Sequence, residues 1–288
     1  MTKEGTEVRP LISVTLLSEN YVKDVSCRAE FGLALWIDTE ERRILFDTGA
    51  SGLFSENAAK KGIDLNAADL CVISHGHFDH TGGMLCFCRE NRGAKIYIHR
   101  DAFGVTYGAT GGQIDGYDCG IRWNGEELMP LRDRLVLTGG PLFLDEDAVI
   151  SGTIPDVPEL QPAEAFFRPD GAGGLRRDTM SHEQFLAIRQ KGKGIVLFSG
   201  CSHKGIVAAA RYAKRLFPGE PLYAVVAGMH LIGADNATRR RVIDCLAEEE
   251  PKLVAPIHCT GLAAICMMRE RFGHRCILTG AGGTLRFD

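Results

Sequence analysis

Residues 70–83 read LCVISHGHFDHTGG, and this stretch decides how the rest of the chain is interpreted. Its apolar start predicts a short buried strand, and three histidines and one aspartate follow within six residues. Imidazole and carboxylate groups are the ligands that zinc and iron accept in open, catalytic sites. His75 and His77 lie two positions apart in an extended segment, so their side chains can point the same way. Asp79 and His80 follow at a predicted helix start and are candidate ligands of a second ion.

On the N-terminal side of this motif, the sequence predicts strands joined by tight turns. Each predicted strand is an apolar or alternating run bounded by Glu, Asp-Thr or Gly. Residues 54–61 predict a helix, and residues 95–99 predict one more strand after the motif. The early strands are LISVTLLSE (11–19), FGLALWIDT (31–39) and RRILFDTG (42–49).

The last third alternates between predicted strands and predicted helices. This alternation, after hairpin-like strands in the first half, predicts an α/β fold with two sheets and helices outside them. Residues from about 100 to 180 are rich in Gly, Asp and Pro, and predict a loop-rich insert within a single domain over residues 1–288. The late strands are GIVLFSG (194–200), LYAVVAGMH (222–230), KLVAPIHC (252–259) and one at the end; the helices are KGIVAAARYAKRLF (204–217), ATRRRVIDCLAEEE (237–250) and LAAICMMRERF (262–272).

The composition is that of an ordinary globular protein, with 45% apolar and 24% charged residues. The net charge of −4 gives no reason to expect nucleic acid or an anionic membrane as a partner. The N-terminus has no signal-peptide layout, and no apolar run is long enough to span a bilayer. Several cysteines (Cys71, Cys245, Cys266, Cys276) lie in apolar patterns, where a free thiol behaves as a small hydrophobe. We therefore expect a reduced, cytoplasmic protein; the composition leaves its oligomeric state open.

The run HGHFDHTGG, preceded by a strand and by ILFDTG (44–49), resembles the His-x-His-x-Asp-His signature of the metallo-β-lactamase superfamily. This resemblance implies a four-layer αββα sandwich with the metals at one edge of its two sheets. A wider set of motifs is similar to the branch of 7,8-dihydropterin-6-methyl-4-(β-D-ribofuranosyl)aminobenzene-5′-phosphate synthase. Relatives tend to carry His at the position of Phe31 and Gly at that of Ala227. These two departures bear on the identity of the substrate and not on the assignment to this branch. The motifs are EFGLALWI, LFDTG, SHGHFDHTGG, GCSHKG, AGMHL and PIHCTG.

The resemblance also implies further ligands in the second half of the chain. His258, in PIHCTG, stands where the superfamily places its last histidine, and His182, in DTMSHEQF, is a candidate for the third position. Most relatives carry a bridging aspartate where this chain has Cys201. A thiolate binds zinc well, and His203 can equally turn inward, so both remain candidates. His230, in VVAGMHL, ends a strand on the same side and is expected to act on the substrate rather than to bind metal.

Two divalent ions, zinc by default with manganese or iron as alternatives, can activate a water and polarise a phosphoryl or carbonyl oxygen. Asp79 would then orient the water or accept its proton, and His203 and His230 are candidate acids or bases. We expect either hydrolysis or transfer of a pterin methyl group with release of diphosphate. The expected substrate is a small molecule, with phosphorylated and pterin-like compounds as candidates.

Two hypotheses from other classes compete with this one. The first is a sensor module that binds metal and ligand on the same fold without turnover. The second is an iron-based redox enzyme, which is disfavoured because His77 stands where di-iron flavoprotein relatives carry a glutamate. The run Arg239–Arg241 near a predicted helix start is interpreted as a solvated face, with a phosphate clamp as the alternative.

Overall fold

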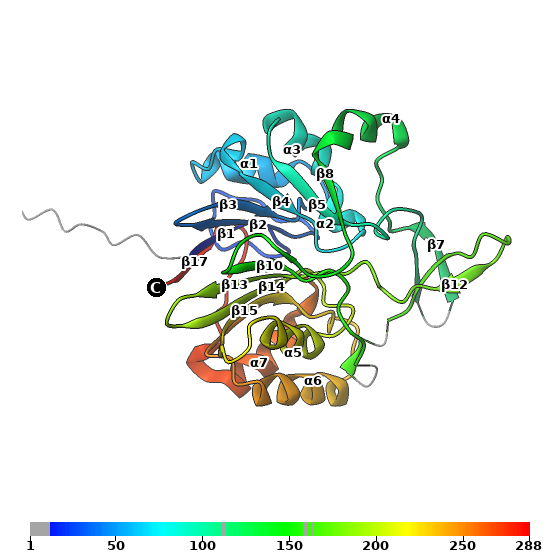
Figure 1. Ribbon diagram of the computed structural model, residues 1–288. Coiled ribbons are helices and arrows are strands. Elements are labelled where there is room, and N and C mark those ends of the chain that lie inside the picture. The colour runs from blue at the N-terminus through cyan, green and yellow to red at the C-terminus, as the bar shows by residue number, and fades with distance from the viewer. Residues whose placement is uncertain (1–11, 111–112, 158–159, 163) are drawn as a thin grey trace, which may run out of the picture.

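The computed structural model describes residues 12–110, 113–157, 160–162 and 164–288, and its main body has four layers (Figure 1). Two sheets pack face to face in the middle, and helices cover the outer face of each sheet. Helices α1 and α3 lie over one sheet, and α5, α6 and α7 lie over the other (Figure 1). The predicted αββα sandwich is therefore confirmed. The longer helices are α1 (Leu53–Lys60), α3 (Met84–Glu90), α5 (Ile206–Leu216), α6 (Asn236–Glu248) and α7 (Leu262–Phe272).

The first sheet has seven strands in the order β17-β1-β2-β3-β4-β5-β8. Strands β17, β1, β2 and β3 pair antiparallel, whereas β3, β4, β5 and β8 pair parallel. The pairing becomes parallel after β3 because helix α1 connects β3 to β4 and helix α3 connects β4 to β5, so that each crossover returns the chain to the same edge of the sheet. The strands are β1 (Ile12–Ser18), β2 (Ala34–Thr39), β3 (Arg43–Phe46), β4 (Leu70–Val72), β5 (Lys95–His99), β8 (Leu135–Thr138) and β17 (Thr284–Phe287).

The second sheet has six strands in the order β16-β15-β14-β13-β10-β9. Strands β14, β15 and β16 are parallel, with α5 and α6 as the crossovers between them, as the alternating sequence pattern predicted. The remaining pairs are antiparallel. The strands are β9 (Leu142–Phe143), β10 (Ala148–Ile150), β13 (Leu186–Gln190), β14 (Gly194–Ser199), β15 (Leu222–Gly228) and β16 (Leu253–Ile257).

Apolar residues fill both faces of the central strands. In β14, Val196 and Phe198 point between the two sheets, whereas Ile195 and Leu197 point toward the outer helices. A strand covered on both faces reads as a continuous apolar run, which is why GIVLFS shows no alternation. Helix α6 has only one apolar side, because it lies at the surface. Its buried residues are Val242, Ile243 and Leu246.

The range from 100 to 180, expected as an insert, divides between the sandwich and a separate sheet. Strands β8, β9 and β10 from this range join the two main sheets. The rest forms a four-stranded sheet in the order β12-β11-β6-β7, at the end of the molecule where α2 (Phe78–Thr81) lies (Figure 1). The elements are β6 (Tyr107–Thr110), β7 (Gln113–Asp118), β11 (Phe166–Pro169), β12 (Leu175–Arg177), α4 (Gly125–Leu128) and a 3-10 turn at Met129–Arg134.

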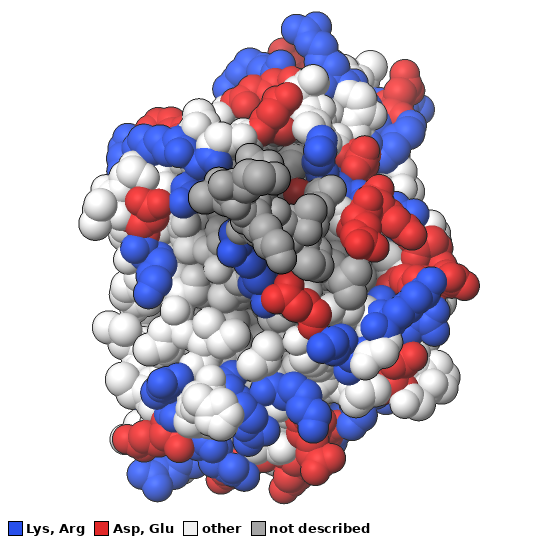
Figure 2. All heavy atoms as spheres, turned by 90° about the vertical axis from the view of Figure 1, so that its left-hand side faces the viewer, with Lys and Arg blue, Asp and Glu red and all other residues white. Residues whose placement is uncertain are grey.

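The cysteines differ in burial, and the surface carries charges of both signs. All ten cysteines are free; Cys71 and Cys276 are buried as the pattern predicted, but Cys266 is exposed because it faces outward on α7. Figure 2 shows the face that carries the C-terminal end of the chain, where both signs of charge are interspersed. Across the described residues, no helix is long and apolar enough to cross a membrane.

Several strands of the two sheets end at one edge, and their following residues take up an unusual backbone conformation. Asp47, Ser202, His230 and His258 come within a few residues of the ends of β3, β14, β15 and β16, and their φ angles are 59°, 57°, 48° and 50°. A left-handed conformation costs a residue other than glycine on the order of 1–3 kcal/mol, and such residues concentrate at functional sites. The carboxyl edge of the sandwich is therefore the place to look for a site.

Candidate metal centre

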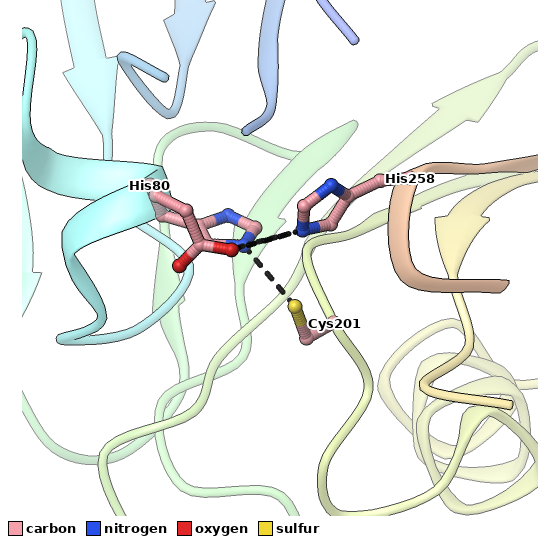
Figure 3. Close-up of side chains that lie close together, drawn as sticks. His80, Cys201 and His258 are labelled. Atoms are coloured by element: carbon pink, nitrogen blue, oxygen red, sulfur yellow. Dashed lines mark hydrogen bonds and ion pairs between the residues drawn. The ribbon is translucent and has the colours of Figure 1, made fainter. Parts of the chain in front are cut away.

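Four buried side chains meet at this edge and bring their ligand atoms within 4.8 Å of one another (Figure 3). They come from α2 and from the segments after β14 and β16, so three distant parts of the chain build one cluster. The Nε2 atom of His80 lies 3.1 Å from the Sγ of Cys201 and 3.2 Å from the Nε2 of His258. The same His258 nitrogen lies 3.2 Å from Oδ2 of Asp79.

A second group adjoins the first and consists mainly of imidazoles. The ligand atoms of His75, Cys201 and His203 also lie within 4.8 Å of one another. His77 belongs beside them, since its ring centroid is 4.6 Å from that of His75 and 4.9 Å from that of His203. The Nε2 atoms of all three histidines are buried and have no hydrogen-bond partner among the described residues.

The lack of partners for these three nitrogens tests whether a metal ion fits the site. A buried polar atom without a partner costs about 1–3 kcal/mol, so three in one place are unfavourable for a purely structural cluster. Neutral imidazole binds zinc well through a ring nitrogen that has no other partner, and the Nε2 atoms of these residues meet this condition. The residues present therefore fit a metal ion.

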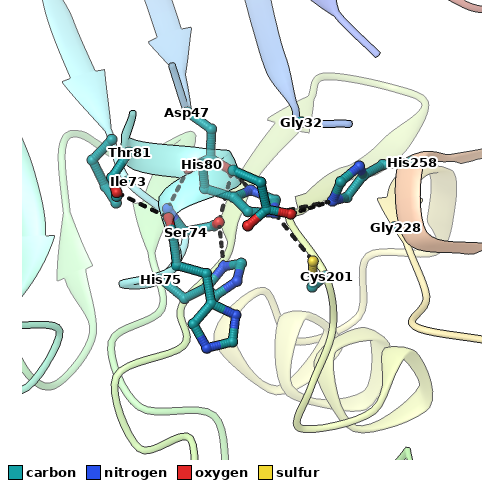
Figure 4. A network of polar contacts seen from close by, with 12 residues as sticks. Gly32, Asp47, Ile73, Ser74, His75, His80, Thr81, Cys201, Gly228 and His258 are labelled. Atoms are coloured by element: carbon teal, nitrogen blue, oxygen red, sulfur yellow. Dashed lines mark hydrogen bonds and ion pairs between the residues drawn. The ribbon is translucent and has the colours of Figure 1, made fainter. Parts of the chain in front are cut away.

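Cys201 is the residue that the two groups share. Its side chain is buried, and Figure 4 shows it between the rings of His80 and His75 and the ring of His258. The sequence left open whether Cys201 or His203 points inward, and the structure brings both to the cluster. Cys201 occupies the position between the two groups, and His203 belongs to the group with His75 and His77.

His182 does not enter either group, although the sequence suggested it as a ligand. Its Nδ1 accepts a hydrogen bond from the backbone N–H of Gly76 at 3.2 Å, and its Nε2 lies 3.2 Å from Oδ2 of Asp178. Both ring nitrogens thus have partners within the protein. Its ring centroid is 6.1 Å from that of His77, behind the motif. Of the two histidines, His203 is the one whose ligand atom lies within a group.

His230 lies at the rim of the cluster, next to His203. The two ring centroids are 4.3 Å apart, and Nε2 of His230 contacts the carboxylate of Glu164. The backbone N–H of His230 points at Sγ of Cys259 at 3.2 Å. Burial alone lowers the pKa of His230, but the contacts with Cys259 and Glu164 raise it to about 10. His230 is therefore a protonated group beside the imidazole cluster.

Asp47 orients two of the imidazoles, and sequence reasoning did not single it out as a site residue. Its Oδ2 lies 2.7 Å from Nδ1 of His80 and accepts a 2.7 Å hydrogen bond from Ser74, whose Oγ is 2.9 Å from Nδ1 of His75 (Figure 4). These contacts turn the Nε2 atoms of both histidines toward the cluster, as carboxylates behind metal-binding histidines do. The absence of a side chain at Gly200 makes space for the Ser74 hydroxyl, since a Cβ at residue 200 would lie 2.2 Å from Ser74 Oγ.

Two buried glutamates hold the backbone of the other candidate ligands. Glu19 accepts the N–H of His258 at 2.6 Å, and the Nδ1 of that histidine lies 3.0 Å from Oδ1 of Asn20. Glu183 accepts the N–H groups of His203 and Lys204, both at 2.7 Å. Sequence reasoning missed both glutamates. A charged residue directly after an apolar run, as Glu19 follows LISVTLLS, is the signal that was available.

Burial and neighbouring charges divide the cluster into neutral and charged groups. Burial lowers the pKa of His75 and His203 well below the usual range, and lowers that of His77 to about 3. Burial also lowers the pKa of His80, but Asp79 and Asp47 raise it to about 9. The first three histidines are therefore neutral, which is the protonation state of a metal ligand.

Asp79 stays ionised despite its position. Burial raises its pKa, but His80 and His258 lower it below the usual range of a carboxyl group. A pocket of about 250 Å³ opens beside the cluster, with His203 and Phe166 in its wall. Phe166 also packs on the ring of His77, with centroids 4.6 Å apart. The strands of the separate sheet thus cover the cluster and form one side of the opening.

Fold and site together define a class: αββα proteins with a histidine- and aspartate-rich edge suited to metal. A family model described as the metallo-beta-lactamase superfamily matches residues 27–142. A protein of Methanocaldococcus jannaschii named 7,8-dihydropterin-6-methyl-4-(beta-D-ribofuranosyl)-aminobenzene-5'-phosphate synthase is 30% identical over 289 residues, covering 96% of this chain and 97% of that relative. The chain belongs to the metallo-β-lactamase superfamily and is similar to the synthase over nearly its whole length.

Two further comparisons mark the range of this similarity. An uncharacterised protein of the same organism is also 30% identical, over 84% of this chain and 88% of the relative. A solved structure described as a metal-dependent hydrolase of the β-lactamase superfamily superposes with a TM-score of 0.80 at 26% identity, covering 96% of this chain and 99% of the other. One of these relatives is thus named a synthase and another is described as a hydrolase.

Proposed function

We propose that this protein is a dinuclear metal-dependent enzyme that cleaves an ester or phosphoester bond of a small molecule. One ion would be held by His75, His77 and His203, and the other by Asp79, His80 and His258, with Cys201 between them. The three unpartnered Nε2 atoms of the first group carry this proposal. Zinc suits these donors best, and manganese or iron remain compatible with them. We place the enzyme in the cytoplasm, where its ten free cysteines stay reduced.

The side chains of this chain have distinct parts in such a reaction. Two divalent ions, when bound, supply Lewis acidity toward a phosphoryl or carbonyl oxygen and lower the pKa of a water. Asp79 is ionised and accepts a proton from the attacking group. His230 is protonated and stands at the rim beside His203, where it donates a proton to the leaving group. Phe166 limits the access of bulk water.

The acceptor of the cleaved group separates two versions of this function. With water as acceptor the enzyme is a hydrolase, as the solved relative is described. With an aromatic carbon or amine as acceptor it is a transferase that joins a pterin methyl group to an aminobenzene ribosyl phosphate and releases diphosphate. The second version is favoured by the named synthase, because that relative is 30% identical to this chain whereas the solved hydrolase is 26% identical.

Metal content per chain, measured on anaerobically purified protein, is the first test. We expect about two ions in the wild type and the loss of at least one in Asp79→Ala. Asp69→Asn is the matched control, because this aspartate is exposed and binds the backbone N–H of Arg43. Substoichiometric metal that the Asp79 variant leaves unchanged would overturn the dinuclear centre.

Turnover then decides between the versions. Release of pyrophosphate that requires both a pterin diphosphate and an aminobenzene ribosyl phosphate identifies the transferase. Hydrolysis of simple phosphodiesters or lactones without a second substrate identifies the hydrolase. Tight binding of metal and pterin with no conversion of any of these compounds would contradict the proposal that the protein is an enzyme, and would identify it as the sensor module.

A further inference from the structure

A basic hollow lies beside strands β11 and β12, next to the pocket that opens at the candidate metal centre. It has a volume of about 630 Å³ and is lined by three arginines, Arg100, Arg168 and Arg176, with the carboxylates of Asp101 and Asp178. These arginines come from three different segments: the turn after β5, strand β11 and strand β12. None of them has a part in the proposed metal chemistry.

Two of these arginines face each other directly across a pair of strands. In the antiparallel pair β11–β12, Arg168 is the partner of Arg176 in the register. Directly opposed residues place their side chains on the same face, and two like charges in such positions are destabilising. Asp178 offsets this repulsion only partly, since its Oδ2 lies 3.6 Å from Nε of Arg168 alone. An anion between the two guanidinium groups would relieve the rest.

The donors of the three arginines are used to different extents. Arg168 is fixed: its Nη1 donates to the carbonyl of Asp101 at 2.7 Å, and its Nη2 donates to the carbonyl of Phe103. Arg100 binds the protein through Nε, which donates to the carbonyl of Thr138 at 3.3 Å. Within the described ranges, no ion pair is formed by Arg100 or Arg176. Their terminal N–H groups are therefore available to a ligand.

The carboxylates around the hollow have partners inside the protein. Asp178 accepts the N–H of Met180 at 2.8 Å and contacts His182 and Arg168. Burial raises its pKa, but the contact with His182 lowers it to about 2, so it stays ionised and engaged. Asp101 lies at the rim, 3.8 Å from Nδ1 of His99. With three arginines against two aspartates, the charge that lines the hollow is positive on balance.

The hollow borders the pocket beside the metal centre. Asp178 and Thr179 line both, and His203 stands in the wall of the second. Arg176 and Arg177 are consecutive in β12, and successive side chains of a strand point to opposite faces. Arg176 accordingly lines the hollow and Arg177 lines the pocket. The hollow and the pocket thus lie on either side of β12, with Asp178 and Thr179 at their common border.

We propose that this hollow binds a terminal phosphate monoester of the substrate, with Arg100 and Arg176 as its donors and Arg168 as a fixed positive charge. Guanidinium groups recognise phosphate through paired, charge-assisted hydrogen bonds. The phosphate would be held away from the bond that is cleaved, so it is a handle for binding and not the leaving group. The proposal rests on the proposed function for the identity of the other end of the substrate.

Calorimetry with D-ribose 5-phosphate tests the site, with D-ribose as the probe that lacks the phosphate. We expect saturable binding of the phosphate ester and at least tenfold weaker binding of ribose. Arg176→Gln and Arg100→Gln are each expected to weaken binding of the ester by about tenfold. Arg240→Gln is the matched control, because Arg240 is exposed on α6 and its substitution should leave the affinity unchanged.

The same titration after removal of metal by a chelator separates this proposal from the proposed function. Binding that persists without metal and still weakens in Arg176→Gln supports the hollow, whatever the metal content turns out to be. Binding that vanishes with the metal and is insensitive to Arg176→Gln would overturn it, as would equal affinity for ribose. Inorganic phosphate that binds more tightly than the ester would also overturn it, since the site would then serve the free ion.

Discussion

The carboxylate of Asp47 and the ring of His80 are in direct contact, with 2.7 Å between Oδ2 and Nδ1, and both side chains are fully buried. This contact fixes which ring nitrogen of His80 points into the cluster, because a nitrogen that donates to a carboxylate cannot also bind metal. Through Ser74 the same carboxylate reaches His75. One side chain behind the cluster thus orients an imidazole of each group.

Replacing Asp47 by Asn tests this role. The amide keeps the shape but loses the charge, so we expect metal affinity to fall by about 10- to 100-fold. Competition with a fluorescent chelator measures the change, and circular dichroism checks that the fold is retained. Asp69→Asn serves again as the control. An affinity equal to that of the wild type would show that Asp47 supports the strand end and not the histidines.

His203 and His182 are expected to respond differently to substitution. His203→Ala should lose at least one ion per chain, because its Nε2 has no other partner in the described structure. His182→Asn should retain both ions and lose stability instead, because the contact with Asp178 is weakened. Elemental analysis and thermal unfolding measure the two effects. The reverse pattern would assign the ligand position to His182.

Glu183 predicts a pH dependence of stability in metal-free protein. Burial raises its pKa from the ordinary 4.5 to about 7, so the folded state binds its proton more tightly than the unfolded state. Its contribution to stability is complete below about pH 4.5 and is lost as the pH rises to 7, a change of roughly 3 kcal/mol.

Urea unfolding at pH 5 and pH 7.5 measures this effect as a difference between two proteins. Glu183→Gln cannot ionise, so its stability should decline less over this interval than that of the wild type. Titration of the buried histidines affects both proteins alike and cancels in the comparison. Parallel declines in the two proteins would mean that Glu183 is already ionised at pH 5.

The interface between the two sheets gives a prediction about stability. Phe198 is fully buried there, and Phe198→Ala should destabilise the protein by about 3–5 kcal/mol through lost burial and the cavity that remains. Phe143→Ala is the matched control, since this ring is 50% exposed, and we expect a change of at most about 0.5 kcal/mol. Chemical denaturation measures both. Equal effects would contradict the packing described between the sheets.

The sequence predicted the elements whose signals are local. The apolar runs gave the central strands, and the alternation of strands and helices after residue 194 gave the parallel half of the second sheet. The separate sheet was missed because β11 and β12 are short and flanked by glycines, which makes them similar to loops. Strand β4 ends at Val72, two residues before the end of LCVIS (70–74), since the N–H of Ser74 donates to Asp47 instead of to a strand.

The choice among candidate ligands depended on contacts that no local pattern contains. His182 and His203 are both histidines near strand ends, and only the packing of Asp178 against His182 sets them apart. Asp47, Glu19 and Glu183 act from behind the cluster through hydrogen bonds to segments far away in the sequence. Their role follows from the tertiary structure, whereas the HGHFDH run is visible within six residues.

The hydrogen bond between Glu19 and the backbone of His258, at 2.6 Å, joins a segment that is translated early to one that is translated late. A ribosome that has completed the HGHFDH run has produced none of Cys201, His203 and His258. The nascent chain therefore carries an incomplete ligand set until β16 has emerged and paired with β15. Binding of the proposed ions would in this way be coupled to completion of the chain, and truncated translation products would lack the full centre.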